Sequence, residues 1–332
     1  MADRTLFDRV RDRAHDRPHR VRGRNPWVLA VDLAHNTVED RVTGLAAEMA
    51  FWALLSFFPL VISISALLGY AEALVGTAEL QRGQDAIVGA LSVVFNPELT
   101  EEVVDPFIGG LLRAEQGGLA ATSLVVTLYL ASRVFTATIR SLDLAYRVAE
   151  ARGLLAQRLL AVAFALGFVV VVVATLLLMV LGPLLGTGES VAERLGLGDV
   201  FAFLWSVFRW PVLLAIMVAF LSAVYRYGPN VENRWRHCLP GALLGVVLWT
   251  LASVGLRLYL EAGGGAAPQV EASDEAVALV GRVVGTLLAL MLWVFLTGFA
   301  ILVGGELNAL LAPRQVRRGG VQPAEAPGAI HD

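Results

Sequence analysis

Residues 46–70 read AAEMAFWALLSFFPLVISISALLGY, and this stretch decides the fold class. Apart from Glu48 it is uncharged, and it is longer than the roughly 20 residues that cross a bilayer as an α-helix. Pro59 lies in its middle, where the missing backbone donor is expected to kink the helix. The stretch predicts a first transmembrane helix, in which Glu48 near one end faces either the membrane interface or a protein partner.

The whole chain has the composition of an integral membrane protein. Of its 332 residues, 57% are hydrophobic and 17% are charged, and the mean hydropathy is +0.67. Such a chain has too few charged residues to cover a soluble domain. All 26 basic residues are arginine, and a single cysteine, Cys238, excludes an intramolecular disulfide and a cysteine-based metal cluster.

Five more apolar stretches of membrane-crossing length follow the first. The six predicted spans are about residues 45–70, 119–142, 159–185, 200–225, 239–260 and 283–311. They predict an all-α membrane protein whose transmembrane domain, residues 45–312, is a six-helix bundle.

The segments outside this domain have distinct expected roles. Residues 1–24 form a charged cytoplasmic arm, and residues 25–44 form an N-terminal interfacial amphipathic helix that begins with Asn25 as cap. The acidic connection after the first span is expected to build a small helical extracytoplasmic cap. The last 20 residues, 313–332, are expected to be a disordered cytoplasmic tail.

The arginines predict the orientation. The two terminal segments and the loops that share their side of the membrane hold 18 arginines. The loops on the opposite side hold 4 arginines and 15 acidic residues. Because positively charged loops stay in the cytoplasm, both termini are expected there, in a multi-pass protein of the cytoplasmic membrane.

Several charged residues fall inside the predicted spans. Arg133 and Arg140 lie in the second span, and Arg209 lies in the fourth, next to Pro211, a second predicted kink. At about 1.5 Å per residue, Glu48, Arg140 and Glu306 come to a similar depth. We expect a buried cluster of Glu48, Glu306 and either Arg133 or Arg140, because an unpaired charge at depth is costly. Alternatively, these groups snorkel to headgroups or hold helices together.

Four blocks resemble the YihY/BrkB family of bacterial inner-membrane proteins. In chain order they are AAEMAFWALLSFFPLV, LYLASRVFTATIRSLDLAYRV, VYRYGPNVENRWRHCLPGALLGVVLW and LLALMLWVFLTGFAILVGGELNALL. The positions that match the family motifs are Ala47, Phe51, Pro59, Arg133, Tyr146, Tyr225, Pro229, Trp235, Pro240, Gly241, Trp293, Gly305, Glu306, Leu307 and Asn308. Phe51-Trp52 stands where the family has paired tyrosines, and the insert 263–274 also departs from its pattern.

The resemblance implies a six-helix protein of the inner membrane and adds Asn308 to the candidate residues. It implies no settled activity. Members have carried the label of ribonuclease BN, a role now credited to an unrelated soluble enzyme, and others are linked to serum resistance or envelope lipid transport. A metal-dependent nuclease needs clustered His, Asp and Glu ligands, whereas the five histidines of this chain form no such group on a predicted rigid element.

Two function hypotheses follow. The first is a transporter or flippase-like protein for an anionic amphiphile, lipid or ion, and the alternative is a non-transporting scaffold for envelope assembly. The expected partners are the bilayer, anionic lipid headgroups and a second copy of the chain in a homo-oligomer, without specific nucleic acid. We expect no catalytic residue, cofactor or metal. The candidate substrate or ion path consists of Glu48, Arg133, Arg140, Arg209, Glu306 and Asn308, with helix kinks at Pro59 and Pro211.

Overall fold

The computed structural model describes residues 25–75, 117–149, 152–184, 198–261 and 275–312, and all regular elements within these ranges are α-helices. These helices are α2 (Pro26–Glu39), α3 (Val42–Val75), α7 (Gly117–Ala145), α8 (Leu154–Leu184), α10 (Gly198–Tyr227), α11 (Trp235–Glu261) and α12 (Glu275–Leu311). All except α2 contain an apolar window long enough to cross a membrane. The prediction of an all-α membrane protein with six spans is therefore confirmed.

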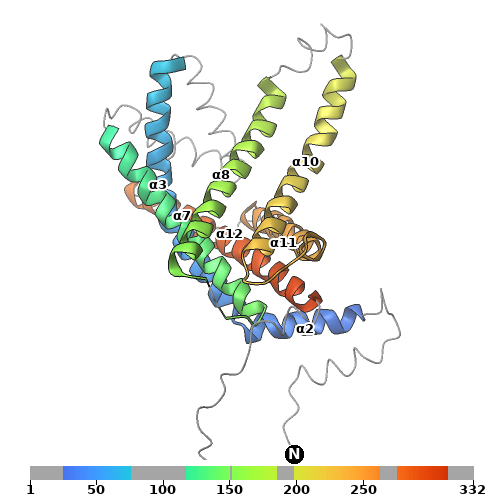
Figure 1. The fold of residues 1–332 in the computed structure, drawn as a ribbon. Helices are drawn as coiled ribbons and strands as arrows, with labels where there is room; N and C mark the ends of the chain where they lie inside the picture. Colours follow the sequence, from blue (N-terminus) through green and yellow to red (C-terminus); the bar gives the residue numbers. More distant parts are fainter. Residues whose placement is uncertain (1–24, 76–116, 150–151, 185–197, 262–274, 313–332) are drawn as a thin grey trace, which may run out of the picture.

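The six long helices pack as a ring in chain order. Each contacts the next, from α3 to α7, α8, α10, α11 and α12, and α12 contacts α3 again. Helix α2 lies across one end of this ring and packs against α12 and α3 (Figure 1). We call this end the α2 end and the other the opposite end. The C-terminus of α12 also lies at the α2 end (Figure 1).

The long helices extend beyond the predicted spans. For example, α12 begins at Glu275 and α8 at Leu154, several residues before the apolar runs that predicted them. Hydropathy reports the part of a helix that suits lipid, whereas the backbone hydrogen bonds continue into polar sequence. The predicted arm 1–24, most of the predicted cap 71–118 and the predicted tail 313–332 lie outside the described residues.

Helix α2 begins as the sequence predicts. Asn25 caps it by accepting a hydrogen bond from the Trp27 backbone N–H at 3.0 Å, and proline follows the cap. The helix ends at Glu39, and α3 begins at Val42. In the turn between them Arg41 has a φ of 53°, in the left-handed region that non-glycine residues rarely adopt. This turn lets α2 lie across the bundle instead of continuing into α3.

The predicted proline kink sites lie inside continuous helices. Helix α3 runs through Pro59 and α10 runs through Pro211 without a break in either element. The Ser63 hydroxyl donates to the Pro59 carbonyl at 2.7 Å, one turn further along α3. The kink angles stay predictions.

The helices α11 and α12 approach most closely where glycines meet. A Cβ atom on Gly241 would collide with the Gly304 carbonyl oxygen and the Asn308 amide, and one on Gly304 would collide with the Gly241 carbonyl. Such contacts between backbones are possible only for glycine. Tyr225 of α10 donates from its hydroxyl to the Ile301 carbonyl at the same crossing, so three helices are fixed together here.

Candidate functional site

Two buried carboxyl groups meet at the α2 end. Asp40 caps the C-terminus of α2 and is 5% exposed, and Glu306 of α12 is 2% exposed. The Glu306 side chain is in hydrogen-bonding contact with the side chains of Asp40 and Asn36. Because Asn36 and Asp40 are four residues apart, they lie on the same side of α2. The packing of α2 across the bundle thus places a polar side of this helix against a buried acid.

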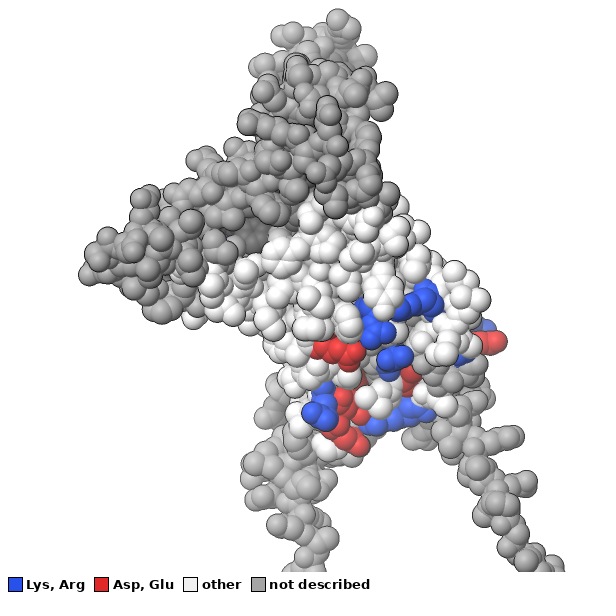
Figure 2. Space-filling view, turned by 90° about the vertical axis from the view of Figure 1, so that its left-hand side faces the viewer, with Lys and Arg blue, Asp and Glu red and all other residues white. Residues whose placement is uncertain are grey.

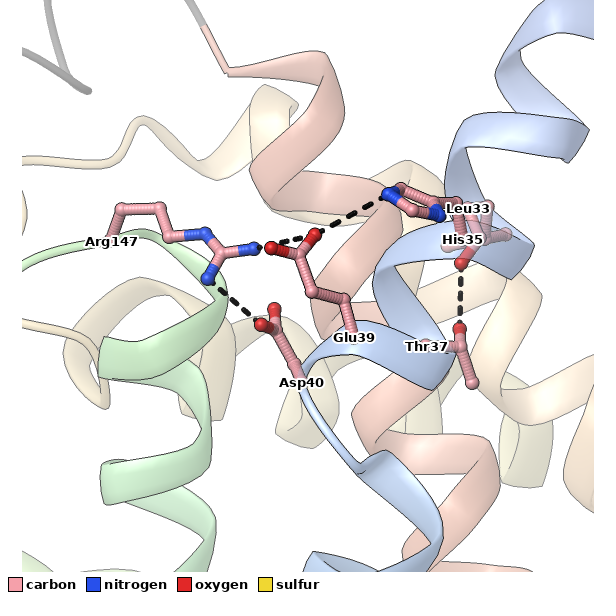
Figure 3. Close-up of polar contacts among 6 residues, drawn as sticks. All are labelled: Leu33, His35, Thr37, Glu39, Asp40 and Arg147. Atoms are coloured by element: carbon pink, nitrogen blue, oxygen red, sulfur yellow. Dashed lines mark hydrogen bonds and ion pairs between the residues drawn. The ribbon is translucent and has the colours of Figure 1, made fainter. Parts of the chain in front are cut away.

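Arg147 links this pair to α7. Its Nη1 lies 2.9 Å from Asp40 Oδ1, and its Nη2 lies 3.4 Å from Glu39 Oε2 (Figure 3). His35 Nε2 reaches the same oxygen of Glu39 at 3.6 Å from one turn earlier in α2. The side chains of Arg147 and Glu39 are 47% and 53% exposed, so this part of the cluster is open to water.

Arg147 also has an unusual backbone conformation. Its φ is 56°, and it stands where a helix commonly ends with glycine. The Arg147 N–H donates to the Leu144 carbonyl at 2.9 Å and the Val148 N–H to the Asp143 carbonyl at 3.0 Å, the two bonds of a Schellman motif. A left-handed arginine costs about 1 kcal/mol relative to glycine. In this conformation the guanidinium reaches Asp40.

Two oxygens of the carboxyl pair lack partners. Asp40 Oδ2 and Glu306 Oε2 are both buried, and neither has a hydrogen-bond partner among the described residues. Burying an ionised carboxylate oxygen without a partner costs several kcal/mol. The ion pair with Arg147 therefore leaves these two buried oxygens in need of a hydrogen-bond donor.

Asn308 bridges α12 and α11. Its Oδ1 accepts from the Gly241 N–H at 2.8 Å, and its Nδ2 donates to the Cys238 carbonyl at 3.0 Å. Pro240 lies between these two positions and cannot donate a backbone hydrogen bond. The Asn308 amide thus stabilises α11 where proline interrupts the bonding, and we assign it to helix packing instead of the substrate path.

Arg133 lies midway along the apolar, membrane-length part of α7. The span runs from Thr122 to Ala145, so Arg133 is about 17 Å from either end. Its guanidinium carbon lies 4.4 Å from the centroid of the Trp52 ring of α3, a cation–π contact. Its Nε is buried without a hydrogen-bond partner, and no carboxylate of the described residues lies within ion-pair distance. Arginine stays charged, so this is a cation at depth for which the described residues supply no carboxylate counter-charge.

The expected cluster of Glu48, Glu306 and an arginine does not form. Glu48 and Arg140 are both exposed, and neither makes an ion pair within the described part of the chain. Glu48 lies about 200° around α3 from the buried Ala46, at 100° per residue, and so faces away from the bundle core. Glu306 meets Asp40 of α2 instead.

Arg209 is separate from the other predicted path residues. It lies close to the start of the apolar span of α10, toward the opposite end of the bundle. Its guanidinium carbon is 5.4 Å from the Trp210 ring, and its Nε is buried without a partner in the described residues. The structure therefore divides the predicted path residues among three places along the bundle.

The partners of Glu306 were missed by sequence reasoning. Asn36, Glu39 and Asp40 fall in the predicted interfacial helix 25–44, and Arg147 falls in the connection after the second predicted span. A signal was present, because Asn36 and Asp40 are spaced one turn apart just before the first span. Nothing in the sequence indicated that this side of α2 faces α12.

The sequence profile of the virulence factor BrkB family matches residues 33–329, which include nearly all the described helices. The chain belongs to the virulence factor BrkB family. Several of its motif residues, among them Tyr225, Gly241 and Asn308, lie at the crossing of α10, α11 and α12. These BrkB-family positions therefore maintain helix packing in this structure.

Relatives of this BrkB-family chain are found among bacterial proteins. It is 29% identical over 270 residues to the "Putative ribonuclease-like protein YfkH" of Bacillus subtilis (strain 168), covering 81% of this chain and 90% of the relative. It is 27% identical over 280 residues to a UPF0761 membrane protein of Aeromonas salmonicida (strain A449), covering 82% and 84%. No solved structure matches the chain. Membership of the BrkB family thus identifies the chain as a bacterial membrane protein but assigns it no activity.

No three His, Cys, Asp or Glu side chains of the described residues are grouped so that they could hold a metal ion. The expectation of a protein without a metal or cofactor stays a prediction.

Proposed function

We propose that this protein is a transporter or flippase-like protein that moves an anionic amphiphile, with Arg133 as the group that receives the anionic headgroup. The observation that carries the proposal is the charged guanidinium midway along α7, with a buried Nε and no carboxylate partner among the described residues. A phosphate or carboxylate supplies the charge and the acceptor atoms that such a guanidinium lacks. Polar residues at membrane depth commonly mark substrate pathways.

A row of hydroxyl groups along the α3–α7 seam supports this proposal. The Ser63 hydroxyl of α3 lies 3.1 Å from the Ser123 hydroxyl and 3.3 Å from the Thr127 hydroxyl of α7. These three groups lie between Arg133 and the opposite end of the bundle. Closer to the α2 end, Thr138 contacts the Met49 sulfur at 3.7 Å. The two antiparallel helices therefore present polar groups to one another over much of the span. A headgroup that enters from the opposite end meets hydroxyls before it reaches Arg133.

The aromatic partner of Arg133 fits a binding role. A cation–π contact places the guanidinium over the Trp52 ring and uses no carboxylate acceptor. Trp52 thus positions Arg133 without neutralising it.

We further propose that the α2 end faces the cytoplasm, in the bacterial cytoplasmic membrane. The arginine-rich segments of the sequence adjoin this end, and Figure 2 shows charged side chains gathered there beside a largely uncharged face. Cys238 is buried, so a reporter cysteine introduced at Asn25 can be labelled selectively. Labelling of that cysteine from outside intact cells would contradict the proposed orientation.

The test of transport uses the purified protein in proteoliposomes. A fluorescent lipid with a phosphate headgroup is followed between leaflets in the wild type and in Arg133→Gln. Losing one charge-assisted contact is expected to lower the rate roughly tenfold or more. Arg140→Gln is the matched control, because Arg140 lies seven residues along the same helix but is exposed near the α2 end, and its rate should stay close to wild type.

Three outcomes separate the hypotheses. Loss of transport in Arg133→Gln with normal folding supports the proposed site. Equal transport by wild type and Arg133→Gln contradicts the role of Arg133. No lipid movement by a well-folded wild type, with any headgroup tested, favours the scaffold hypothesis and overturns transport.

A further inference from the structure

The charges at the α2 end do not balance if every carboxyl group is ionised. Glu39, Asp40 and Glu306 meet one arginine, Arg147. Glu39 is half-exposed and can be solvated by water, so it needs no further partner. Asp40 and Glu306 are buried, and Arg147 can neutralise one of the two. The second buried carboxylate would be left without a counter-charge, which is strongly unfavourable.

The geometry of the pair indicates how this charge is removed. The two carboxyl groups are in hydrogen-bonding contact, and each has a buried oxygen without a partner among the described residues. Two ionised carboxylates cannot donate to one another, whereas a protonated carboxyl group donates to an ionised one. Pairs of this kind share one proton, because like charges so close together cannot both ionise.

We propose that Asp40 and Glu306 form a proton-binding site, in which one proton lies between their carboxyl groups and joins α2 to α12. The proton comes from water at the α2 end. Arg147 neutralises the remaining negative charge through Asp40, and the Asn36 amide donates to Glu306. The site does not depend on the proposed transport, since it follows from the contacts of these residues alone.

The charged and titratable groups around the pair come from each packed element. From α2 they are His35, which reaches Glu39, and Glu39 itself. From the turn after α2 there is Arg41, which is exposed. From the end of α7 there is Arg147. None of these supplies a second buried positive charge, so loss of the proton leaves repulsion between α2 and α12.

The first experiment observes the proton directly. Infrared difference spectra between neutral and alkaline pH are recorded on the full chain in lipid nanodiscs. The wild type should lose the carbonyl stretch of a protonated carboxylic acid as the pH rises. Glu306→Gln should lack this band, and Asp40→Asn should lack it as well, because Arg147 is then free to neutralise Glu306. Glu232→Gln, an exposed carboxyl group in the loop before α11, is the matched control and should keep it.

The second experiment measures the melting temperature against pH. The folded protein holds one proton more at neutral pH than the unfolded chain, in which both carboxyl groups are ionised. Above the ordinary pKa of a carboxyl group, and until the folded pair loses its proton, the stability must therefore fall as the pH rises, by about a factor of ten in the unfolding equilibrium per pH unit. Glu306→Gln resembles the protonated acid and should lose this slope, while Glu232→Gln should keep it. If Glu306→Gln does not fold, Asp40→Asn provides the same test.

Two results would overturn the proposal. One is a wild-type spectrum without a band that depends on Glu306 or Asp40. The other is a melting temperature that rises with added Na⁺ or Ca²⁺ in the wild type but not in Glu306→Gln, which would identify a metal cation between the carboxylates. Because neither readout measures lipid movement, failure here leaves the transport proposal to its own test.

Discussion

The half of the bundle near α2 and the half toward the opposite end are packed differently. In α8, Gln157, Ala161, Phe164 and Ala165 are buried, whereas no described side chain beyond Ala165 is. In α11 the buried positions end at Val246, although the helix continues to Glu261. The ring of helices is therefore tightly closed at the α2 end and presents apolar side chains outward over much of the other half.

The difference separates the contacts that hold the helices together from the region that is proposed to admit substrate. Glycine contacts, the Asn308 bridge and the carboxyl pair lie in the packed half. Among the side chains that the structure describes, the opposite half has few buried groups, and those include the hydroxyls of Ser123 and Thr127 on α7. A transporter that is closed on one side and accessible to substrate on the other would have this distribution. Two pairs of substitutions compare the halves directly, and a third pair tests a turn within the packed half.

The largest effect is expected at Gly241 in the packed half of α11. Gly241→Ala places a methyl group against backbone atoms of Gly304, which cannot move aside, and should cost about 4 kcal/mol or more. Gly255→Ala is the matched substitution in the opposite half of the same helix, where nothing lies within 4 Å. It should stabilise the helix by about 0.5 to 1 kcal/mol. Unfolding in mixed micelles measures both, and equal effects would contradict the contrast between the halves.

A smaller effect is expected from the hydrogen bonds that join α11 and α12. Asn308→Ala leaves the Gly241 N–H and the Cys238 carbonyl buried without their side-chain partner, at a cost of about 2 to 3 kcal/mol. In the opposite half, Ser253 accepts from the Trp293 indole at 3.1 Å in a partly buried contact. Ser253→Ala should cost about 0.5 to 1 kcal/mol. A larger loss for Ser253→Ala would show that the opposite half is held as firmly as the packed half.

The smallest effect separates the backbone from the side chain at Arg147. Arg147→Ala and Arg147→Gly both lose the contacts with Asp40 and Glu39. Glycine alone removes the strain of the left-handed conformation, so Arg147→Gly should be more stable than Arg147→Ala by about 1 kcal/mol. Thermal unfolding of the two variants decides this. Equal stabilities would mean that the turn adopts another conformation once the ion pairs are lost.

The fold could be predicted because its signals are local. Apolar runs of sufficient length specify membrane helices wherever they occur, and Asn25 before a proline specifies a helix start. The depth of Glu306 could be estimated by counting residues, and the count placed it near one end of the bundle. Depth alone leaves open the direction in which a side chain points around its helix, and this is why Glu48 was assigned to the wrong group of neighbours.

The sequence by itself determined six apolar helices, the expected charge asymmetry and the membrane class, since these depend on hydropathy and charge along the chain. The tertiary structure decided which polar groups meet. Each residue advances about 100° around its helix, so the direction of a side chain depends on how the helix is rotated about its own axis. Because α2 could pack across the bundle in several such rotations, the packing of α2 decides which residue contacts Glu306. The burial of Asp40 beside Glu306, and the contact of Arg133 with the Trp52 ring, arise from that packing.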